Sequence, residues 1–173
     1  GSGPYTVTTS PALTSGGTYS VRAIATDLAG NTSTTALSTT NGRITVDTTA
    51  PTAGTLTMTT TDDGASSSDG IVGTLTPSFS LATASDTAYT GTNAPTAAIA
   101  SVVIQVSSDG GTTWTTKGTS ASSSAPYTAT LAGLTSGTTY SIRALVTDTA
   151  GNTVTSALST TSGKITVDTT APT

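Results

Sequence analysis

The sequence predicts an all-β protein, an antiparallel β-sandwich built from tandem repeats of about 120 residues. Apolar and polar residues alternate with a period of two in several short stretches, whereas the i, i+3, i+4 spacing of a helix is rare. Turn-forming residues separate these stretches, as a sandwich requires. In addition, a long segment of the chain occurs twice.

The composition allows only a thin core. Leu, Ile, Val and Phe account for 28 of the 173 residues. This share of about 16% falls below the roughly 20% under which disorder becomes plausible. However, the net charge is only -4, and the 47 threonines favour strands. We therefore expect a thin β-sandwich, in which the few apolar residues line one face of each strand, rather than a disordered chain.

The repeat defines the domain organisation. The segment that begins at Leu13 with LTSGGTYSVRAIATD recurs from Leu134 as LTSGTTYSIRALVTD, at an offset of 121 positions and without a gap. One complete unit is expected over 48–170. Residues 1–47 match only the C-terminal portion of a unit, and residues 171–173 match the start of a further one, as in a window cut from a longer array.

Seven strands are expected in the complete unit, each bounded by turn residues. In chain order they cover 56–60, 75–81, 101–107, 113–117, 127–131, 139–147 and 164–168. The clearest is 139–147, where every second residue is apolar, as in a half-buried antiparallel strand. The predicted inward residues there are Tyr140, Ile142, Ala144 and Val146, and the first copy repeats the pattern at Tyr19, Val21, Ala23 and Ala25.

A hairpin is expected between the third and fourth of these strands. The octet SSDGGTTW, from Ser107 to Trp114, fits the Asp-box pattern of sialidases. We interpret it as a turn in which Asp109 accepts hydrogen bonds from the turn backbone and Trp114 packs beneath it. A sialidase would also need several blades and an arginine cluster, which five dispersed cations cannot supply.

Missing side chains exclude several chemistries. The chain has no His and no Cys, so it cannot form a disulfide, a thiolate or imidazole metal site, or a nucleophile paired with histidine. Its five cations under a negative net charge cannot build the basic patch that nucleic acid or an anionic membrane needs. No apolar run approaches the roughly 20 residues that span a bilayer. We expect no nucleic-acid partner, no membrane insertion and no enzymatic activity.

Two motifs that occur in both copies carry a family resemblance. D-x-A-G-N lies at 27–31 and 148–152, and V-D-T-T-A-P-T lies at 46–52 and 167–173. Together with LTSGTTYSIRALVTD, they resemble fibronectin type III modules and the tandem bacterial immunoglobulin-like domains of large surface adhesins. The resemblance implies an immunoglobulin-like sandwich in a secreted, extracellular protein of the bacterial cell surface. It also implies a non-enzymatic stalk whose domain junctions contact neighbouring repeats and bind Ca²⁺.

The acidic residues favour the same cation on chemical grounds. All nine are Asp, and most lie in loops rich in Gly, Ser and Thr, which suits a hard cation that prefers oxygen ligands. Asp is also an ordinary turn residue, so a purely structural role stays open for each of them.

In an immunoglobulin-type sandwich these residues fall into two groups. Asp47, at the exit of the first unit, is expected to face Asp86, Asp148 and Asn152 of the second; Asp27 and Asn31 are the first-copy equivalents of Asp148 and Asn152. At the opposite end, Asp168 is expected near Asp62, Asp63 and Asp69. Carboxylates that converge in this way repel one another unless a cation compensates.

Two functions remain open at this stage: the calcium-stiffened stalk, and an accessory module that binds carbohydrate or another surface polymer. The second would need exposed aromatic side chains, and Tyr89 in the long 82–100 loop is the only candidate not tied to the repeat. The apolar face of residues 1–47 also needs a cover. Self-association or strand exchange with a neighbouring molecule, or truncation of a longer chain, would each account for it.

Overall fold

The computed structural model describes residues 3–39, 42–59, 69–86, 98–160 and 162–173. In these ranges the chain forms β-strands, as predicted, and no helix is long and apolar enough to cross a membrane. The chain divides into two compact units. Unit 1 holds Gly1–Thr49 and Ala88–Ala94, and unit 2 holds Ala50–Thr87 and Pro95–Thr173.

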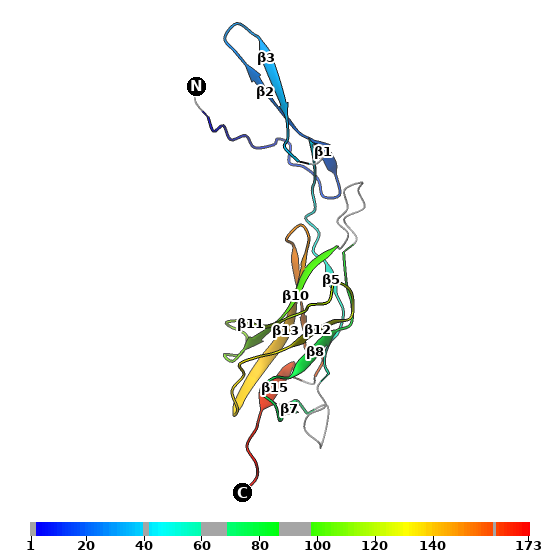
Figure 1. Ribbon diagram of the computed structural model, residues 1–173, viewed down its shortest axis with the longest axis vertical. Coiled ribbons are helices and arrows are strands. Elements are labelled where there is room, and N and C mark those ends of the chain that lie inside the picture. The colour runs from blue at the N-terminus through cyan, green and yellow to red at the C-terminus, as the bar shows by residue number, and fades with distance from the viewer. Residues whose placement is uncertain (1–2, 40–41, 60–68, 87–97, 161) are drawn as a thin grey trace. The chain divides into compact units, whose positions relative to one another are not determined.

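The larger sheet of unit 2 has the strand order β11-β10-β13-β15-β7, and β14 also pairs with β13 (Figure 1). Its strands are β7 (Ile71–Val72), β10 (Ile99–Ser107), β11 (Thr115–Thr119), β13 (Thr138–Asp148), β14 (Thr153–Ala157) and β15 (Lys164–Val167). The first part of β13 pairs with β15 and the later part with β14, so two short strands share one long partner. All pairings are antiparallel except β7 with β15.

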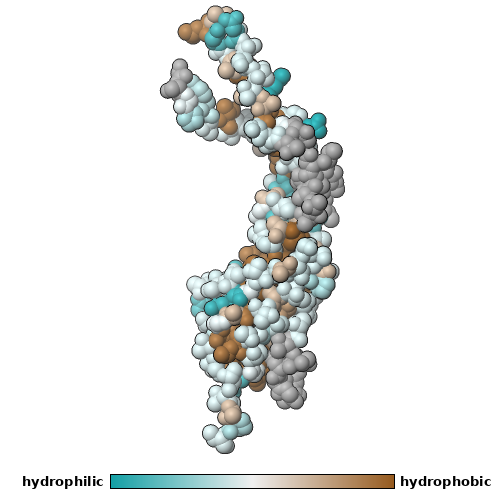
Figure 2. Space-filling view, viewed as in Figure 1, coloured by the Kyte–Doolittle hydropathy of each residue, from teal (hydrophilic) through white to brown (hydrophobic). Residues whose placement is uncertain are grey.

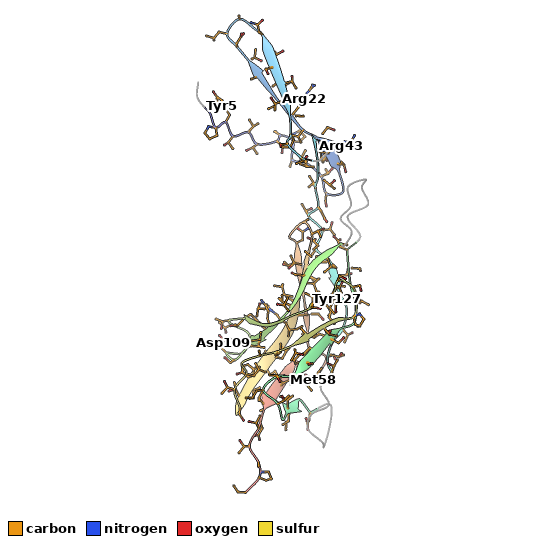
Figure 3. All side chains as sticks on the ribbon, viewed as in Figure 1. Tyr5, Arg22, Arg43, Met58, Asp109 and Tyr127 are labelled. Carbon is orange, nitrogen blue, oxygen red and sulfur yellow. The ribbon has the colours of Figure 1, made fainter. Side chains whose placement is uncertain are left out.

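A second sheet of unit 2 has the order β12-β8-β6, and a two-stranded sheet joins β5 to β9. These strands are β5 (Thr52–Ala53), β6 (Leu56–Met58), β8 (Ser78–Leu81), β9 (Ala84–Ser85) and β12 (Tyr127–Thr130). Tyr127 and Met58, on the two outer strands of the second sheet, are labelled in Figure 3.

One core lies between the two larger sheets of unit 2. The predicted inward residues of β13 are all buried, and Ile142 is only 1% exposed. Buried side chains of the second sheet, such as Phe79 and Leu81, belong to the same cluster. The β-sandwich that the alternation predicts is therefore confirmed in unit 2, although the chain is poor in large apolar residues.

The predicted strands all have counterparts in unit 2, but four strands were missed: the two-residue strands β5, β7 and β9, and the longer β14. The sequence leaves 148–163 as a loop between strands, whereas Thr153–Ala157 forms β14 and pairs with β13 along five register positions. Three of the five residues of β14 are Thr or Ser, so it lacks the apolar alternation that would have identified it. The loop that follows β13 is consequently a tight hairpin turn.

The described residues of unit 1 form the same strand pairings that β13 makes with β15 and β14 in unit 2. Here β1 (Thr18–Ser20) pairs with β4 (Arg43–Thr45), and β2 (Arg22–Thr26) pairs with β3 (Thr32–Ala36). Every register pair recurs in unit 2 at the offset of 121: Tyr19 opposite Ile44, for example, becomes Tyr140 opposite Ile165. The repeat seen in the sequence is thus a repeat of strand pairing as well.

The two copies differ in burial. No described residue of unit 1 is buried, and Val21 is 36% exposed where its equivalent Ile142 is 1% exposed. Apolar side chains (brown) accordingly lie at the surface around β2 and β3 (Figure 2). Within the described residues of unit 1, no second sheet covers the face that is inward in unit 2.

Candidate functional site

Asp148 ends β13 and closes the turn into β14. Its Oδ1 accepts hydrogen bonds from the backbone amides of Ala150 and Asn152, both at 2.8 Å, and its Oδ2 accepts one from Nδ2 of Asn152 at 2.9 Å. Asp148 is only 1% exposed. The burial of a carboxylate is tolerated because these donors replace the water that it loses. The D-x-A-G-N motif therefore encodes a tight hairpin turn.

The same turn forms in unit 1 between β2 and β3. Asp27 accepts hydrogen bonds from the amides of Ala29 at 2.9 Å and Asn31 at 2.8 Å, and from Nδ2 of Asn31 at 2.8 Å. These bonds, above all the one from the Asn31 side chain, lower the pKa of Asp27. Because the motif closes the hairpin in both units, its recurrence in the sequence has a structural cause.

Asp86 lies close to Asp148 within unit 2. It directly follows β9, which is held by the pairing of Thr52 with Ser85 and by their hydroxyl groups at 2.7 Å. Carboxylate oxygens of Asp86 and Asp148 lie within 4.8 Å of each other. We call these two residues the acidic pair. Two carboxylates at this separation repel each other, and a divalent cation between them would remove that repulsion.

Asn152 completes the polar surroundings of the acidic pair. Its Nδ2 is committed to Asp148, so any metal ligation would use its Oδ1. Carboxylate and amide oxygens are the ligands that Ca²⁺ prefers, and it takes six to eight of them. The acidic pair and Asn152 fit Ca²⁺ in chemical type, but the remaining ligands would have to come from other side chains, backbone carbonyls or water.

Asp47 belongs to unit 1, where its Oδ1 accepts a hydrogen bond from the amide of Thr49 at 2.9 Å. Five positions further along the chain, Thr52 pairs with Ser85, the neighbour of Asp86. Five extended residues span at most about 17 Å. The predicted place of Asp47 beside the acidic pair stays a prediction.

The group expected at the other end of unit 2 stays a prediction. Asp69 lies at the start of the parallel β7–β15 pairing, where neighbouring Gly70 approaches the carbonyl of Lys164. Asp168 follows the other end of β15, four positions further on. Because the two strands run parallel, Asp69 precedes their pairing and Asp168 follows it. Asp62 and Asp63 lie outside the described residues.

Asp109 occupies the turn between β10 and β11 (Figure 3). It accepts hydrogen bonds from Oγ of Ser107 at 2.6 Å, Oγ1 of Thr113 at 2.6 Å and the amides of Thr112 and Thr113 at 2.9–3.0 Å. The Ser107 and Thr113 donors hold the pKa of Asp109 well below its usual range. The interpretation of this octet as a hairpin turn is confirmed.

Trp114 and Arg143 form a contact that the sequence analysis missed. Trp114 donates its Nε1 hydrogen to the carbonyl of Gly111 at 2.9 Å, and the Arg143 guanidinium lies 4.0 Å from the centre of its ring. Nε of Arg143 also donates to Oε1 of Gln105 at 2.9 Å. The alternation of β13 places Arg143 opposite the core, which is the signal that could have identified this contact.

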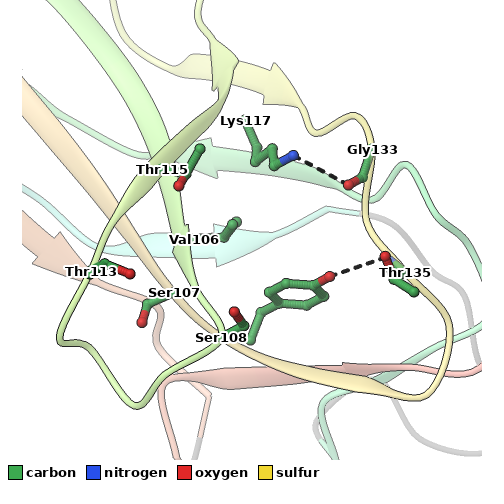
Figure 4. A pocket seen from close by; sticks show the side chains of 9 residues that line it. Val106, Ser107, Ser108, Thr113, Thr115, Lys117, Gly133 and Thr135 are labelled. Carbon is green, nitrogen blue, oxygen red and sulfur yellow. Dashed lines mark hydrogen bonds between the residues drawn. The ribbon is translucent and has the colours of Figure 1, made fainter.

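A shallow polar hollow lies beside β10 and β11 (Figure 4). Serine and threonine hydroxyls line it, together with Lys117 and Tyr140. Nζ of Lys117 donates to the carbonyl of Gly133 at 3.3 Å, and the hydroxyl of Tyr140 accepts from the amide of Thr135 at 3.1 Å. These polar groups hold the 133–135 segment against the sheet, so the hollow has a structural explanation.

Comparison with known proteins identifies no relative: neither a protein-family model nor a curated protein matches this chain.

Proposed function

We propose that this chain is a non-enzymatic structural module, a stretch of the stalk of a secreted adhesin or fibre on a bacterial cell surface. The observation that carries the proposal is the recurrence of one strand-pairing scheme at a constant offset of 121 residues. A protein that repeats a whole structural unit in tandem gains length with each copy, and length is the main property that a spacer needs.

We further propose that the sandwich is of the immunoglobulin type. In support, the strand order β11-β10-β13-β15-β7 lies against β12-β8-β6, and the first strand segments contribute to both sheets. The parallel pairing of β7 with β15 brings an early strand beside the last one. This arrangement agrees with the family resemblance of the two motifs.

The junction between units is proposed to bind Ca²⁺ through Asp47, Asp86, Asp148 and Asn152. The proximity of the acidic pair supports this, as does the short connection from Asp47 to Thr52. The oxygen ligands lie at the ends of strands and in a β-hairpin turn. A bound cation would link the end of one repeat to the next repeat.

The proposal is tested by thermal unfolding of the full chain in calcium and in chelator. At a calcium concentration of about 100 times Kd, binding to the folded state alone adds about 2.7 kcal/mol of stability, which raises Tm by about 5–10 °C in a chain of this size. We expect Asp86→Asn to abolish this rise. Asp109→Asn is the control and should keep the rise, because Asp109 is a loop aspartate of unit 2 that is not among the proposed ligands and whose carboxylate is held by Ser107 and Thr113.

No rise in Tm at millimolar calcium would end the calcium proposal but leave the stalk proposal standing. The stalk proposal itself fails if the chain is retained on immobilised polysaccharide and Trp114→Ala abolishes that retention. The outward stack of Trp114 and Arg143 is the described feature that such a carbohydrate module would use.

A further inference from the structure

Arg143 is a half-buried cation of unit 2 whose partners carry no charge. Its Nε donates to Oε1 of Gln105 at 2.9 Å, and its guanidinium lies 4.0 Å from the centre of the Trp114 ring. Within the described residues it forms no ion pair. Nη1 and Nη2 therefore keep donors that match the two oxygens of a carboxylate, and the ring contact and the Gln105 bond fix the direction of these donors in advance.

Uncharged side chains surround this guanidinium on the outward face of β10 and β13. Val103 and Leu145 lie opposite each other, directly beside the cross-strand pair of Gln105 and Arg143, and both are half-buried. Arg143 is the only charged residue at the outward positions of these two strands. Together with Trp114, these four residues form what we call the Arg143 face. Aromatic, apolar and arginine side chains in this combination are enriched in protein interfaces.

The complementary groups lie at one edge of the same sheet, beside β7. Asp69 is exposed, and its Oδ1 accepts a hydrogen bond from the amide of Ile71 at 2.9 Å, while its Oδ2 has no partner within the described residues. Ile71 is 47% exposed, and it is one of two large apolar residues, with Leu75, that are exposed in the described part of unit 2. A carboxylate and an apolar side chain thus lie next to each other, and we call Asp69 and Ile71 the Asp69 patch.

The two surfaces do not meet within one molecule. In the sheet, β15 lies between β13 and β7, and Arg143 on β13 is directed the other way, toward Gln105 on β10 (Figure 1). Two copies of the chain can bring the surfaces together. The carboxylate of Asp69 would then accept hydrogen bonds from the guanidinium of Arg143, and Ile71 would cover apolar surface of the Arg143 face. Apolar burial provides affinity, and the charge pair selects the partner surface.

We propose that the Arg143 face binds the Asp69 patch of a second copy of this chain. Because the contact joins two different surfaces, a bound pair still presents one surface of each kind, and association continues beyond two copies. The contact uses neither unit 1 nor the acidic pair. It is therefore separate from the calcium proposal, and it would bundle stalks into a fibre.

The test is sedimentation equilibrium of the full chain over a range of concentrations, in chelator. We expect the average mass of the wild type to rise with concentration. Arg143→Glu and Asp69→Arg should each weaken association by about tenfold or more, because like charges then face each other. The double variant should associate again, since the exchanged charges attract. Recovery in the double variant distinguishes a direct contact between the two residues from two separate disturbances of the fold.

A matched control comes from the first copy of the repeat. Arg22 is equivalent to Arg143 at the offset of 121, so Arg22→Glu makes the same change of charge in unit 1 and should leave association within about twofold. Ile71→Ser should weaken association while leaving the Tm of dilute protein close to that of the wild type, because Ile71 is largely exposed.

Three results would overturn the proposal. The first is a monomeric mass at every concentration. The second is an equal loss of association with Arg22→Glu and Arg143→Glu, which would indicate a general effect of net charge. The third is a double variant that associates no better than the single variants, which would mean that Arg143 and Asp69 do not contact each other between copies.

Discussion

Asp109 illustrates how one carboxylate holds a turn together. Its two oxygens accept hydrogen bonds from two hydroxyls and two amides of the β10–β11 hairpin. Its pKa is thereby lowered from the ordinary value of 3.8. A group with a lowered folded-state pKa stabilises the fold fully above its ordinary value, and the contribution is lost as the pH falls toward the folded-state value.

We therefore expect Asp109→Ala to lower Tm at pH 7 and to lower it progressively less as the pH drops below 3.8. The measurement is thermal unfolding followed by the fluorescence of Trp114, which belongs to unit 2. Asp27→Ala, a change in the equivalent kind of turn in unit 1, should leave this transition unaltered. If Asp109→Ala lowers Tm by the same amount at pH 7 and at pH 2, the charge of Asp109 does not stabilise the turn as proposed.

For the aspartates of unit 2, the sequence indicates which residues lie close together but not whether they close a turn or bind a metal. The loop positions in an immunoglobulin-type sandwich lead to the expectation that Asp86 and Asp148 lie close together, and their carboxylate oxygens are within 4.8 Å of each other. Their role as ligands stays a prediction. Turn closure and metal binding both use Asp and Asn in glycine-containing loops, and the turns at Asp27 and Asp148 show identical hydrogen bonds, so sequence alone cannot separate the two uses.

At the scale of elements, Gly70 determines how closely β7 can approach β15. Its φ is +79°, and a Cβ at this position would lie 2.8 Å from the carbonyl oxygen of Lys164. Gly70 also accepts a hydrogen bond from the amide of Thr166 at 2.7 Å. A side chain here would be strained by the dihedral angle and would push the two parallel strands apart.

We expect Gly70→Ala to destabilise unit 2 by about 2 kcal/mol or more, because it adds a backbone clash to the cost of a left-handed conformation. Gly137→Ala is the matched control: its φ is +78°, but its Cβ would meet nothing within 4 Å. Denaturant unfolding of the two variants isolates the contact with β15. An equal decrease in the free energy of unfolding in both variants would show that the close approach of β7 to β15 does not add to the cost of the substitution.

Strands were predictable where apolar residues alternate over several positions, as in β10 and β13. They were missed where the element is too short or too polar to carry a pattern. β5, β7 and β9 have two residues each, and β14 consists mainly of Thr and Ser. These four strands form because neighbouring strands offer backbone partners, and such tertiary support leaves no mark on local sequence.

At the scale of the whole molecule, the same alternating sequence pattern occurs in both copies of the repeat but is buried in only one of them. The residues inward in unit 2 are buried between two sheets, whereas their equivalents in unit 1 face solvent in the described structure. The same substitution should therefore have unequal effects in the two units.

We expect Ile142→Ala to destabilise unit 2 by about 2–5 kcal/mol, since Ile142 is 1% exposed within the core. Val21→Ala, at the equivalent position, should change the Trp114-monitored unfolding free energy by no more than about 0.5 kcal/mol. Chemical denaturation of both variants provides the comparison. A large loss with Val21→Ala would mean that unit 1 and unit 2 unfold as one cooperative structure.

The repeat is the feature of the whole molecule that sequence reveals best, because equivalent residues of the two copies form equivalent pairings. Sequence does not reveal whether a copy has a complete core. The same alternation in Tyr19–Ala25 and Tyr140–Val146 predicts an inward face in both copies, yet burial depends on the strands that lie opposite.

The pairing of the early and late strands of unit 2 has a mechanical consequence. Leu56 forms a parallel bridge with Leu158, and β7 runs parallel to β15. Tension applied at the two ends of this unit pulls the members of each parallel pair in opposite directions along their own axes. Their hydrogen bonds are perpendicular to the applied force and must break together, instead of one after another. Resistance to pulling is therefore concentrated in a few short contacts between the first strands and the last.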